Sequence, residues 1–115
     1  MREVEETDLI SFFGVLPQEQ SHEEREFFDA PLFVKTVRNL RLSCSVSFHS
    51  RDIALTLAAV GDEADVLEYR LRGAETVQIE QDKNGRLWLR VHSNRGDEVA
   101  VAVEPTIRVR IRTNS

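Results

Sequence analysis

The sequence lacks the features on which several common classes of protein depend. Its single cysteine, Cys44, has no partner for an intramolecular disulfide, so the chain is not a disulfide-stabilised scaffold. No apolar stretch approaches the roughly 20 residues that span a bilayer. The acidic start from Met1 to Glu6 contains no apolar run and does not match a signal peptide. We therefore expect a cytoplasmic protein with no membrane segment.

Motifs for catalysis and cofactor binding are also missing. The sequence contains no P-loop, no GxSxG nucleophile turn and no GxGxxG dinucleotide-binding loop. The three histidines, His22, His49 and His92, do not have the close spacing of metal-binding pairs. Cys44 lies among alternating apolar residues, and a buried thiol is a poor nucleophile. These absences predict a non-catalytic protein that binds no metal or cofactor.

Lysine is scarce, and charge is unevenly distributed along the chain. Lys35 and Lys83 are the only lysines, so arginine carries almost all of the positive charge. The net charge is −5, and the nine acidic residues of segment 1–31 outnumber Arg2 and Arg25 to give that segment −7. An acidic chain with so little lysine is poorly suited to following a phosphate backbone. The composition therefore argues against nucleic acid as a partner.

The acidic N-terminal segment, residues 1–31, is predicted to be helical within a single domain, 1–115, that is large enough for one core. Thr7-Asp8 can cap a first short helix rich in apolar residues. Ser21 begins a capping-box pattern for a second helix, and Pro31 ends it. We expect both helices to pack on the body of the domain, residues 32–115.

The body of the domain shows an almost continuous β-strand pattern, clearest from Leu40 to Leu57. Apolar and polar residues alternate there on both sides of a polar turn, as in strands with one buried face. Two such stretches joined by a short loop indicate an antiparallel hairpin. Placing inward residues opposite inward residues gives a loop of His49–Asp52 and sets Phe48 opposite Ile53.

The same rule of parity predicts the later strand pairs. Three-residue loops that contain glycine would set Ile79 opposite Leu89, Val91 opposite Val99, and Leu71 opposite Val77. The alternation then continues from Val99 to Ile111, which we interpret as one long strand bent at Pro105. The fold class is thus mainly β (α+β): an antiparallel meander of about seven or eight strands, as one curved sheet or a sandwich, with short N-terminal helices packed on it.

The polar face of these strands is the first candidate for a binding surface. Tryptophan and arginine dominate binding hot spots in proteins, and a tryptophan here alternates with arginines on one strand. The alternative interpretation is a solvated face laced by arginine–glutamate pairs between strands. The predicted partner-binding residues are Arg70, Arg72, Arg86, Trp88, Arg90, His92, Arg108, Arg110 and Arg112.

An acidic patch is the second candidate surface. Acidic proteins can neutralise basic enzymes through electrostatic steering, although capping and solvation also explain such acids. The predicted patch consists of Glu23, Glu24, Glu26, Asp62, Glu63 and Asp65.

Three hypotheses of function follow from these surfaces. The first is a non-catalytic protein–protein interaction domain of the kind found in bacterial immunity or inhibitor proteins, which bind a toxin. The second is a module that binds an anionic ligand or nucleic acid through its arginine and tryptophan face. The third is a homo-oligomeric subunit that pairs with its copy through the C-terminal strand.

Overall fold

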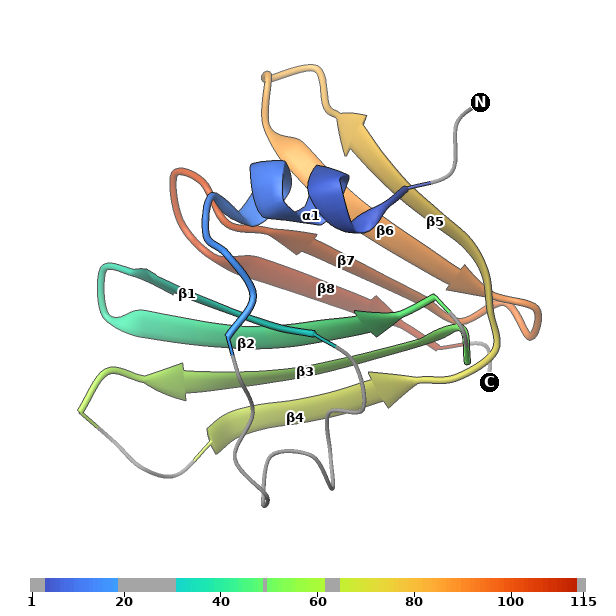
Figure 1. Cartoon of the computed structure of the whole chain (residues 1–115), viewed down its shortest axis with the longest axis horizontal. Coiled ribbons are helices and arrows are strands. Elements are labelled where there is room, and N and C mark those ends of the chain that lie inside the picture. The colour runs from blue at the N-terminus through green and yellow to red at the C-terminus, as the bar shows by residue number, and fades with distance from the viewer. Residues whose placement is uncertain (1–3, 19–30, 49, 62–64, 114–115) are drawn as a thin grey trace.

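The computed structural model describes residues 4–18, 31–48, 50–61 and 65–113, and the second predicted helix lies outside them. Within these residues, the elements in chain order are α1 (Glu6–Phe13), β1 (Leu32–Val37), β2 (Leu40–Ser47), β3 (Asp52–Ala59), β4 (Asp65–Leu71), β5 (Ala74–Gln81), β6 (Leu87–Ser93), β7 (Glu98–Ala102) and β8 (Arg108–Arg112). The strands form two antiparallel sheets, with the orders β1-β2-β3-β4 and β5-β6-β7-β8 (Figure 1). The prediction of a mainly β, antiparallel fold is confirmed, and it takes the form of two sheets.

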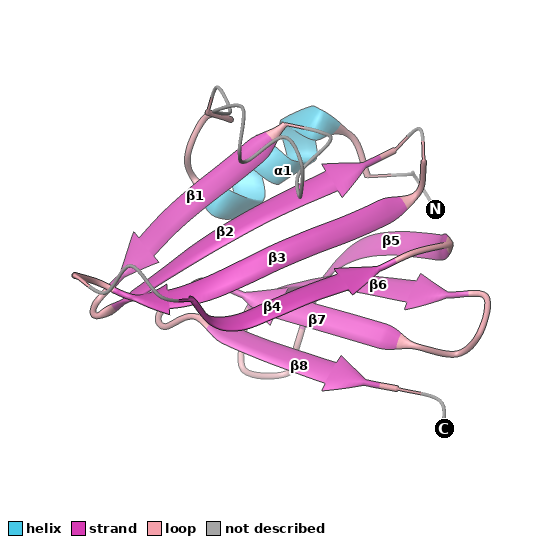
Figure 2. Ribbon diagram, turned by 90° about the horizontal axis from the view of Figure 1, so that it is seen from below, coloured by secondary structure: helices cyan, strands magenta, loops and turns pink. Residues whose placement is uncertain are grey.

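The two sheets face each other and share one hydrophobic core (Figure 2). Because side chains alternate along a strand, every second residue of the central strands points into the space between the sheets. The fully buried residues of this core include Leu42, Cys44, Leu55, Leu89, Val91, Val99 and Val101. The remaining residues of these strands point away from the core and form the two outer faces.

Helix α1 packs at the core beside β1, as the sequence predicted for the first helix. The helix begins after Glu5, whose backbone N–H donates a hydrogen bond of 2.8 Å to the carboxylate of Asp8. It ends at Gly14, which adopts the left-handed conformation with φ of 72°. The ring of Phe13 is buried and stacks on the ring of Phe33 in β1, with 5.1 Å between the centroids. This contact anchors the helix to the first sheet.

The first hairpin has a different register from the predicted one. Val46 lies opposite Ile53, so the loop consists of Phe48–Arg51 and the predicted pairing of Phe48 with Ile53 is wrong. The observed register differs from the predicted one by two residues, and a shift of two leaves every side chain on the same face. Phe48 was counted as a strand residue because it is apolar, but its side chain is 42% exposed at the turn.

Two of the three later pairings are confirmed, and the third is wrong. Ile79 lies opposite Leu89 and Val91 opposite Val99. The third prediction fails because Leu71 in β4 pairs with Ile53 in β3, and the chain then crosses to the other sheet.

The crossing between the sheets has its own anchor. Arg51 donates hydrogen bonds from its guanidinium to the backbone carbonyl oxygens of Ala74, at 2.7 Å, and Glu75, at 2.9 Å. This side chain ties the β2–β3 turn to the start of β5, and so holds the two sheets together at one end of the molecule.

The C-terminal residues form a hairpin instead of one long bent strand. Val99 in β7 lies opposite Ile111 in β8, and residues 103–107, which include Pro105, form the loop. A loop of this length leaves odd-numbered residues facing inward in both β7 and β8. The alternation therefore continues through the loop, which is why the sequence pattern resembled a single strand.

The burial of Cys44 leads to a prediction about its reactivity. Burial of the thiol, which is 0% exposed, raises its pKa to about 12 from the usual 9.0. We expect the native protein to resist N-ethylmaleimide at pH ~8 and the denaturant-unfolded protein to react fully, as followed by mass spectrometry. Rapid, stoichiometric labelling of the native protein would contradict this placement of Cys44.

Candidate partner-binding face

Most of the predicted partner-binding residues meet on the outer face of the β5–β8 sheet. The side chains of Trp88, Arg90 and His92 alternate along β6 with residues of the core, and Arg86 directly precedes this strand. Strand β7 lies between β6 and β8, and Ala100 of β7 pairs with Arg110 of β8. The outward residues of β8 are Arg108, Arg110 and Arg112. We call these three residues the arginine edge, because β8 is the last strand of its sheet.

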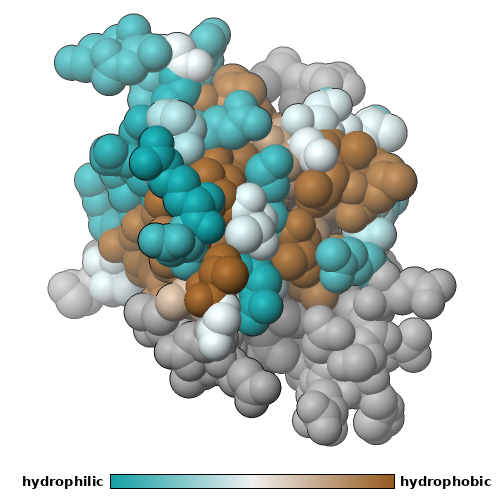
Figure 3. All heavy atoms as spheres, turned by 90° about the vertical axis from the view of Figure 1, so that its left-hand side faces the viewer, coloured by the Kyte–Doolittle hydropathy of each residue, from teal (hydrophilic) through white to brown (hydrophobic). Residues whose placement is uncertain are grey.

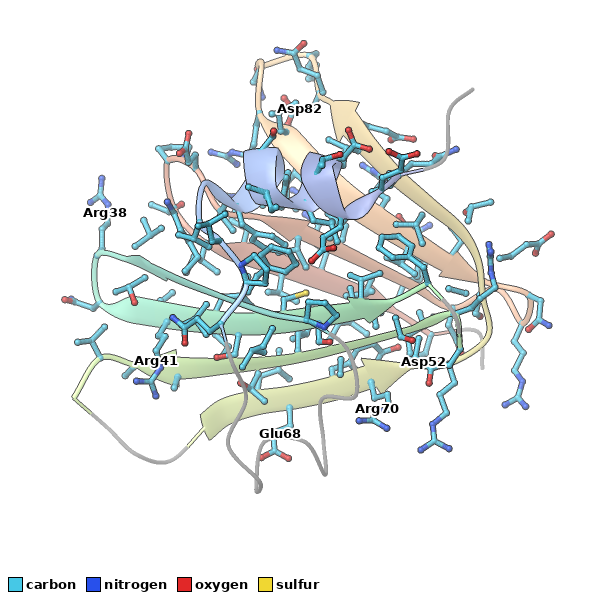
Figure 4. All side chains as sticks on the ribbon, in the orientation of Figure 1. Arg38, Arg41, Asp52, Glu68, Arg70 and Asp82 are labelled. Atoms are coloured by element: carbon cyan, nitrogen blue, oxygen red, sulfur yellow. The ribbon has the colours of Figure 1, made fainter. Side chains whose placement is uncertain are left out.

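Arg70 and Arg72 do not belong to this face. Arg70 comes from β4 in the other sheet, where its neighbours Tyr69 and Leu71 point into the core. Figure 4 shows Arg70 and Glu68 on the same strand, β4, of the β1–β4 sheet. Arg72 follows the end of β4 and is exposed. The predicted set of residues is therefore divided between the two sheets.

Trp88 lies on the outer face, as parity predicted, but its ring is almost completely covered. The side chain is 2% exposed and packs with Ala100 and Ala102 of the neighbouring strand. The guanidinium of Arg110 lies 4.6 Å from the ring centroid, in a cation–π contact. Trp88 thus lies beneath Arg110 and contributes almost no accessible surface to the face. The two alanines were the missed signal, because small residues leave room for a ring to lie flat across a sheet.

The covered ring is also held at its polar end by Asp82, in the turn between β5 and β6 (Figure 4). The indole N–H of Trp88 donates a hydrogen bond of 3.0 Å to one carboxylate oxygen. The other oxygen accepts hydrogen bonds from the backbone N–H groups of Asn84, at 2.8 Å, and Arg86, at 3.0 Å. The bond from Trp88, followed by the bond from Arg86, lowers the pKa of the Asp82 carboxyl from its usual 3.8.

The lowered pKa of Asp82 predicts an acid-sensitive turn. A carboxyl with a lower pKa in the folded state adds stability above its usual value of 3.8. That stability is lost as the pH falls below 3.8 and through the lowered pKa. We expect Asp82→Asn, which keeps one acceptor oxygen but cannot titrate, to flatten the pH dependence of the unfolding free energy in this acid range. Urea titrations followed by Trp88 fluorescence would measure it, and equal slopes in both proteins would refute the assignment.

The charged residues nearest Trp88 pair with one another across the sheet. Arg90 forms ion pairs with Glu80 in β5, at 3.0 Å, and with Glu98 in β7, at 2.9 Å. His92 lies 3.9 Å from the same carboxylate of Glu98. In this part of the face, the interpretation as a ladder of ion pairs fits the structure, and such partly exposed pairs contribute about 0–1 kcal/mol each.

The arginine edge differs from this neutralised part of the face. Arg108, Arg110 and Arg112 are all exposed. Within the part of the chain that the structure describes, Arg108 and Arg112 form no ion pair. Arg110 is occupied by the ring of Trp88 instead of a carboxylate. The face therefore combines a centre of ion pairs with an edge of exposed arginines, of which Arg112 lies opposite Glu98 in the strand register without forming an ion pair.

The predicted acidic patch stays a prediction. Glu23, Glu24, Glu26, Asp62 and Glu63 lie outside the described residues. Asp65 begins β4, and its side chain is likewise outside them.

Two hollows open in the described surface, and the second of them reaches Arg86. A cavity of about 160 Å³ between the β2–β3 turn and β5 is lined by Val46, Phe48 and Val77. A wider depression of about 720 Å³ is lined by Phe12 of α1, by Leu87 at the start of β6, and by residues of the β5–β6 and β7–β8 turns. Figure 3 faces the end of the molecule with the β7–β8 turn and shows apolar surface among hydrophilic residues.

Neither metal-site chemistry nor a membrane span is found in the described residues. No group of three or more histidine, cysteine, aspartate or glutamate side chains among them could hold a metal ion. The helix that the structure describes is too short and too polar to cross a membrane.

Comparison with known proteins places this mainly β, two-sheet fold beside that of one solved complex. No protein-family model matches the sequence, and no curated protein matches it. The structure is similar to a chain of the contact-dependent growth inhibition toxin–immunity protein complex from Klebsiella pneumoniae 342, with a TM-score of 0.73. The two chains are 18% identical, and the match covers 96% of this chain and 94% of the other. At this identity, the likeness shows a shared fold.

Proposed function

We propose that this chain is a non-catalytic, immunity-type protein that neutralises a bacterial protein toxin by binding to it in the cytoplasm. The observation that carries the proposal is the likeness in fold to a chain of a toxin–immunity protein complex, which extends over 96% of this chain. Neutralisation by binding needs a complementary surface and no reactive group. The absence of catalytic motifs from the sequence is consistent with that mode of action.

The outer face of the β5–β8 sheet supports the proposal in a second way. A partner-binding surface benefits from side chains that are already ordered, because ordering them on binding costs about 0.5–1.5 kcal/mol for each. Here Trp88 is fixed by Asp82, Arg110 lies on Trp88, and Arg90 is held between two glutamates. Such a face suits a protein partner that recognises a fixed pattern of charge.

The long-range charge of the chain also favours a basic partner. At a net charge of −5, this protein attracts a positively charged toxin and raises the rate of encounter. Salt should weaken this attraction, so the association rate should fall as the ionic strength rises.

The proposal predicts that a toxin domain is encoded beside the gene for this chain, and that domain is the partner used in the test. We expect co-expression of this chain to restore the growth of bacteria that produce the toxin domain, and the two purified proteins to elute as one complex from a size-exclusion column. An unrelated immunity protein serves as the control and should do neither. The proposal is overturned if the folded chain neither binds the toxin domain nor protects the cells.

A further inference from the structure

We infer that the free edge of β8 binds an extended segment of the partner protein in which acidic and apolar residues alternate. The inference rests on the proposed function, because it names the chemistry of the partner at this face. It is carried by three features of the edge: its open backbone, its arginines that form no ion pair among the described residues, and the support that Trp88 gives to the central one.

The backbone of β8 is open on one side. The strand is the last in the order β5-β6-β7-β8, and no described strand lies beyond it. The backbone groups on the free side of such a strand can pair with an added strand, which is a common mode of peptide recognition. The inward-facing residues of β8 are not fully buried either, since Ile111 is 37% exposed and Val109 is half-buried. An added strand would cover both with its own apolar residues.

The positive charge of the edge determines which residues of the partner segment alternate with its apolar ones. Arg108, Arg110 and Arg112 occupy alternate positions on one face, so neighbouring arginines are about 7 Å apart along the strand. Residues opposite one another on paired strands share a face, and opposite charges at such positions stabilise the pair. Arg108 lies opposite Ala102, and Arg112 lies opposite Glu98. Because neither arginine forms an ion pair among the described residues, both guanidinium groups can still bind a carboxylate of the partner.

The central arginine is held in place before any partner binds. Arg110 lies 4.6 Å from the ring of Trp88, and that ring is anchored by its bond to Asp82. An arginine that stacks on a fixed aromatic ring loses less conformational freedom when it binds a carboxylate. We therefore expect Arg110 to set the register of the added strand.

The same arginines oppose pairing of β8 with a second copy of itself. In an antiparallel pair centred on Arg110, that residue would face its own copy, and Arg108 would face Arg112. Like charges directly opposite one another are destabilising, and edge strands commonly carry charge that prevents such pairing. The edge therefore favours an acidic segment of the partner over self-association, even where the partner as a whole is basic.

The first test uses a fluorescent seven-residue peptide of alternating glutamate and valine as the probe, with the full chain. We expect saturable binding by fluorescence anisotropy and slower hydrogen exchange at the amides of β8. Replacing the glutamates of the peptide by lysine, or methylating its alternate backbone amides, should each abolish binding, because the first removes the charge match and the second the backbone pairing. Equal binding of the lysine peptide or the methylated peptide would overturn the inference.

Charge reversal in the protein provides the matched comparison. We expect the double variant Arg108→Glu, Arg112→Glu to bind the glutamate peptide at least about tenfold more weakly than the unaltered chain. The control, Arg38→Glu with Arg41→Glu, makes the same change of charge on exposed residues of β2 and the turn before it, in the other sheet, and should change the affinity less than about twofold. Equal losses in the two variants would show a non-specific effect of charge and overturn the inference.

The toxin domain separates this inference from the proposed function. If the Arg108→Glu, Arg112→Glu variant binds the toxin domain as tightly as the unaltered chain, the β8 edge is not the docking site, but the proposed function stands. If the unaltered chain does not bind the toxin domain, the proposed function fails, whatever the peptide does. Dimers that light scattering detects in the unaltered chain but not in the variant, or tighter binding to single-stranded DNA than to the peptide, would assign the edge to another occupant and overturn the inference.

Discussion

Replacing Trp88 by alanine is expected to lower the free energy of unfolding by about 3–5 kcal/mol, the usual cost of removing a buried aromatic side chain. The ring is 2% exposed, packs on Ala100 and Ala102, and donates a hydrogen bond to Asp82. Its loss would leave a hollow on the sheet and remove one hydrogen-bond partner of the carboxylate. Urea unfolding followed by circular dichroism measures the change.

Two further variants divide the stability that Trp88 contributes into its packing and its contact with Arg110. Arg110→Ala removes the cation above the ring and should cost about 0.5–1 kcal/mol, because this arginine is exposed. Trp88→Phe keeps most of the covered area and should fall between the two. If Trp88→Ala changed the stability by less than ~0.5 kcal/mol, the ring would not support the face as described.

Replacing Phe13 by alanine is expected to have an effect of similar size, about 3–5 kcal/mol, for a different reason. Phe13 is 1% exposed, stacks on Phe33 at 5.1 Å and meets Phe12 edge-on at 5.0 Å. It belongs to α1, which is too short to be stable without such packing. We therefore expect the variant to lose both core packing and the hold of the helix on the first sheet.

Leu16 provides the control for Phe13, because it is also large and apolar but 73% exposed. Leu16→Ala should change the free energy of unfolding by no more than ~0.5 kcal/mol. Faster hydrogen exchange in α1 should accompany Phe13→Ala and be absent from Leu16→Ala. Equal effects of the two changes would contradict the packing of α1 on β1.

The alternation of apolar residues was sufficient to predict the strands, but not all of their partners. Parity identifies which face a residue occupies, so it correctly paired Ile79 with Leu89. It cannot detect a shift of two residues, which is why Phe48 was placed in the strand and not in the turn. It also continues through a loop that keeps the faces in step, as at Pro105. The crossing between sheets near Gly73 left no trace in the pattern, because Leu71 before it and Val77 after it have the same parity and both pack on the core.

The sequence predicted which residues share the candidate face, but not how deeply each of them is buried. Parity placed Trp88 and Arg90 together on one outer face, and the structure agrees. The burial of the ring depends on Ala100 and Ala102, which are neighbours only once the strand order is known. For the same reason, Arg70 could not be assigned to the opposite sheet from the sequence alone.

The two parts of the outer face differ in how their charges are paired, and this difference bears on the proposed function. At the centre, Arg90 forms ion pairs with Glu80 and Glu98. At the edge, Arg108 and Arg112 are exposed and form no ion pair among the described residues. A partner that binds such a face gains most at the edge, where no existing ion pair has to be broken.

Binding to the toxin domain that the proposed function predicts beside this gene is the most direct test of the account. Isothermal titration calorimetry of the two purified proteins should give a 1:1 complex with a dissociation constant of about 100 nM or tighter, within the range of specific protein pairs. The same mixture should lose the activity of the toxin at equimolar ratio. No heat of binding at ~10 µM protein, with the toxin still active beside an excess of the folded chain, would contradict the proposed function.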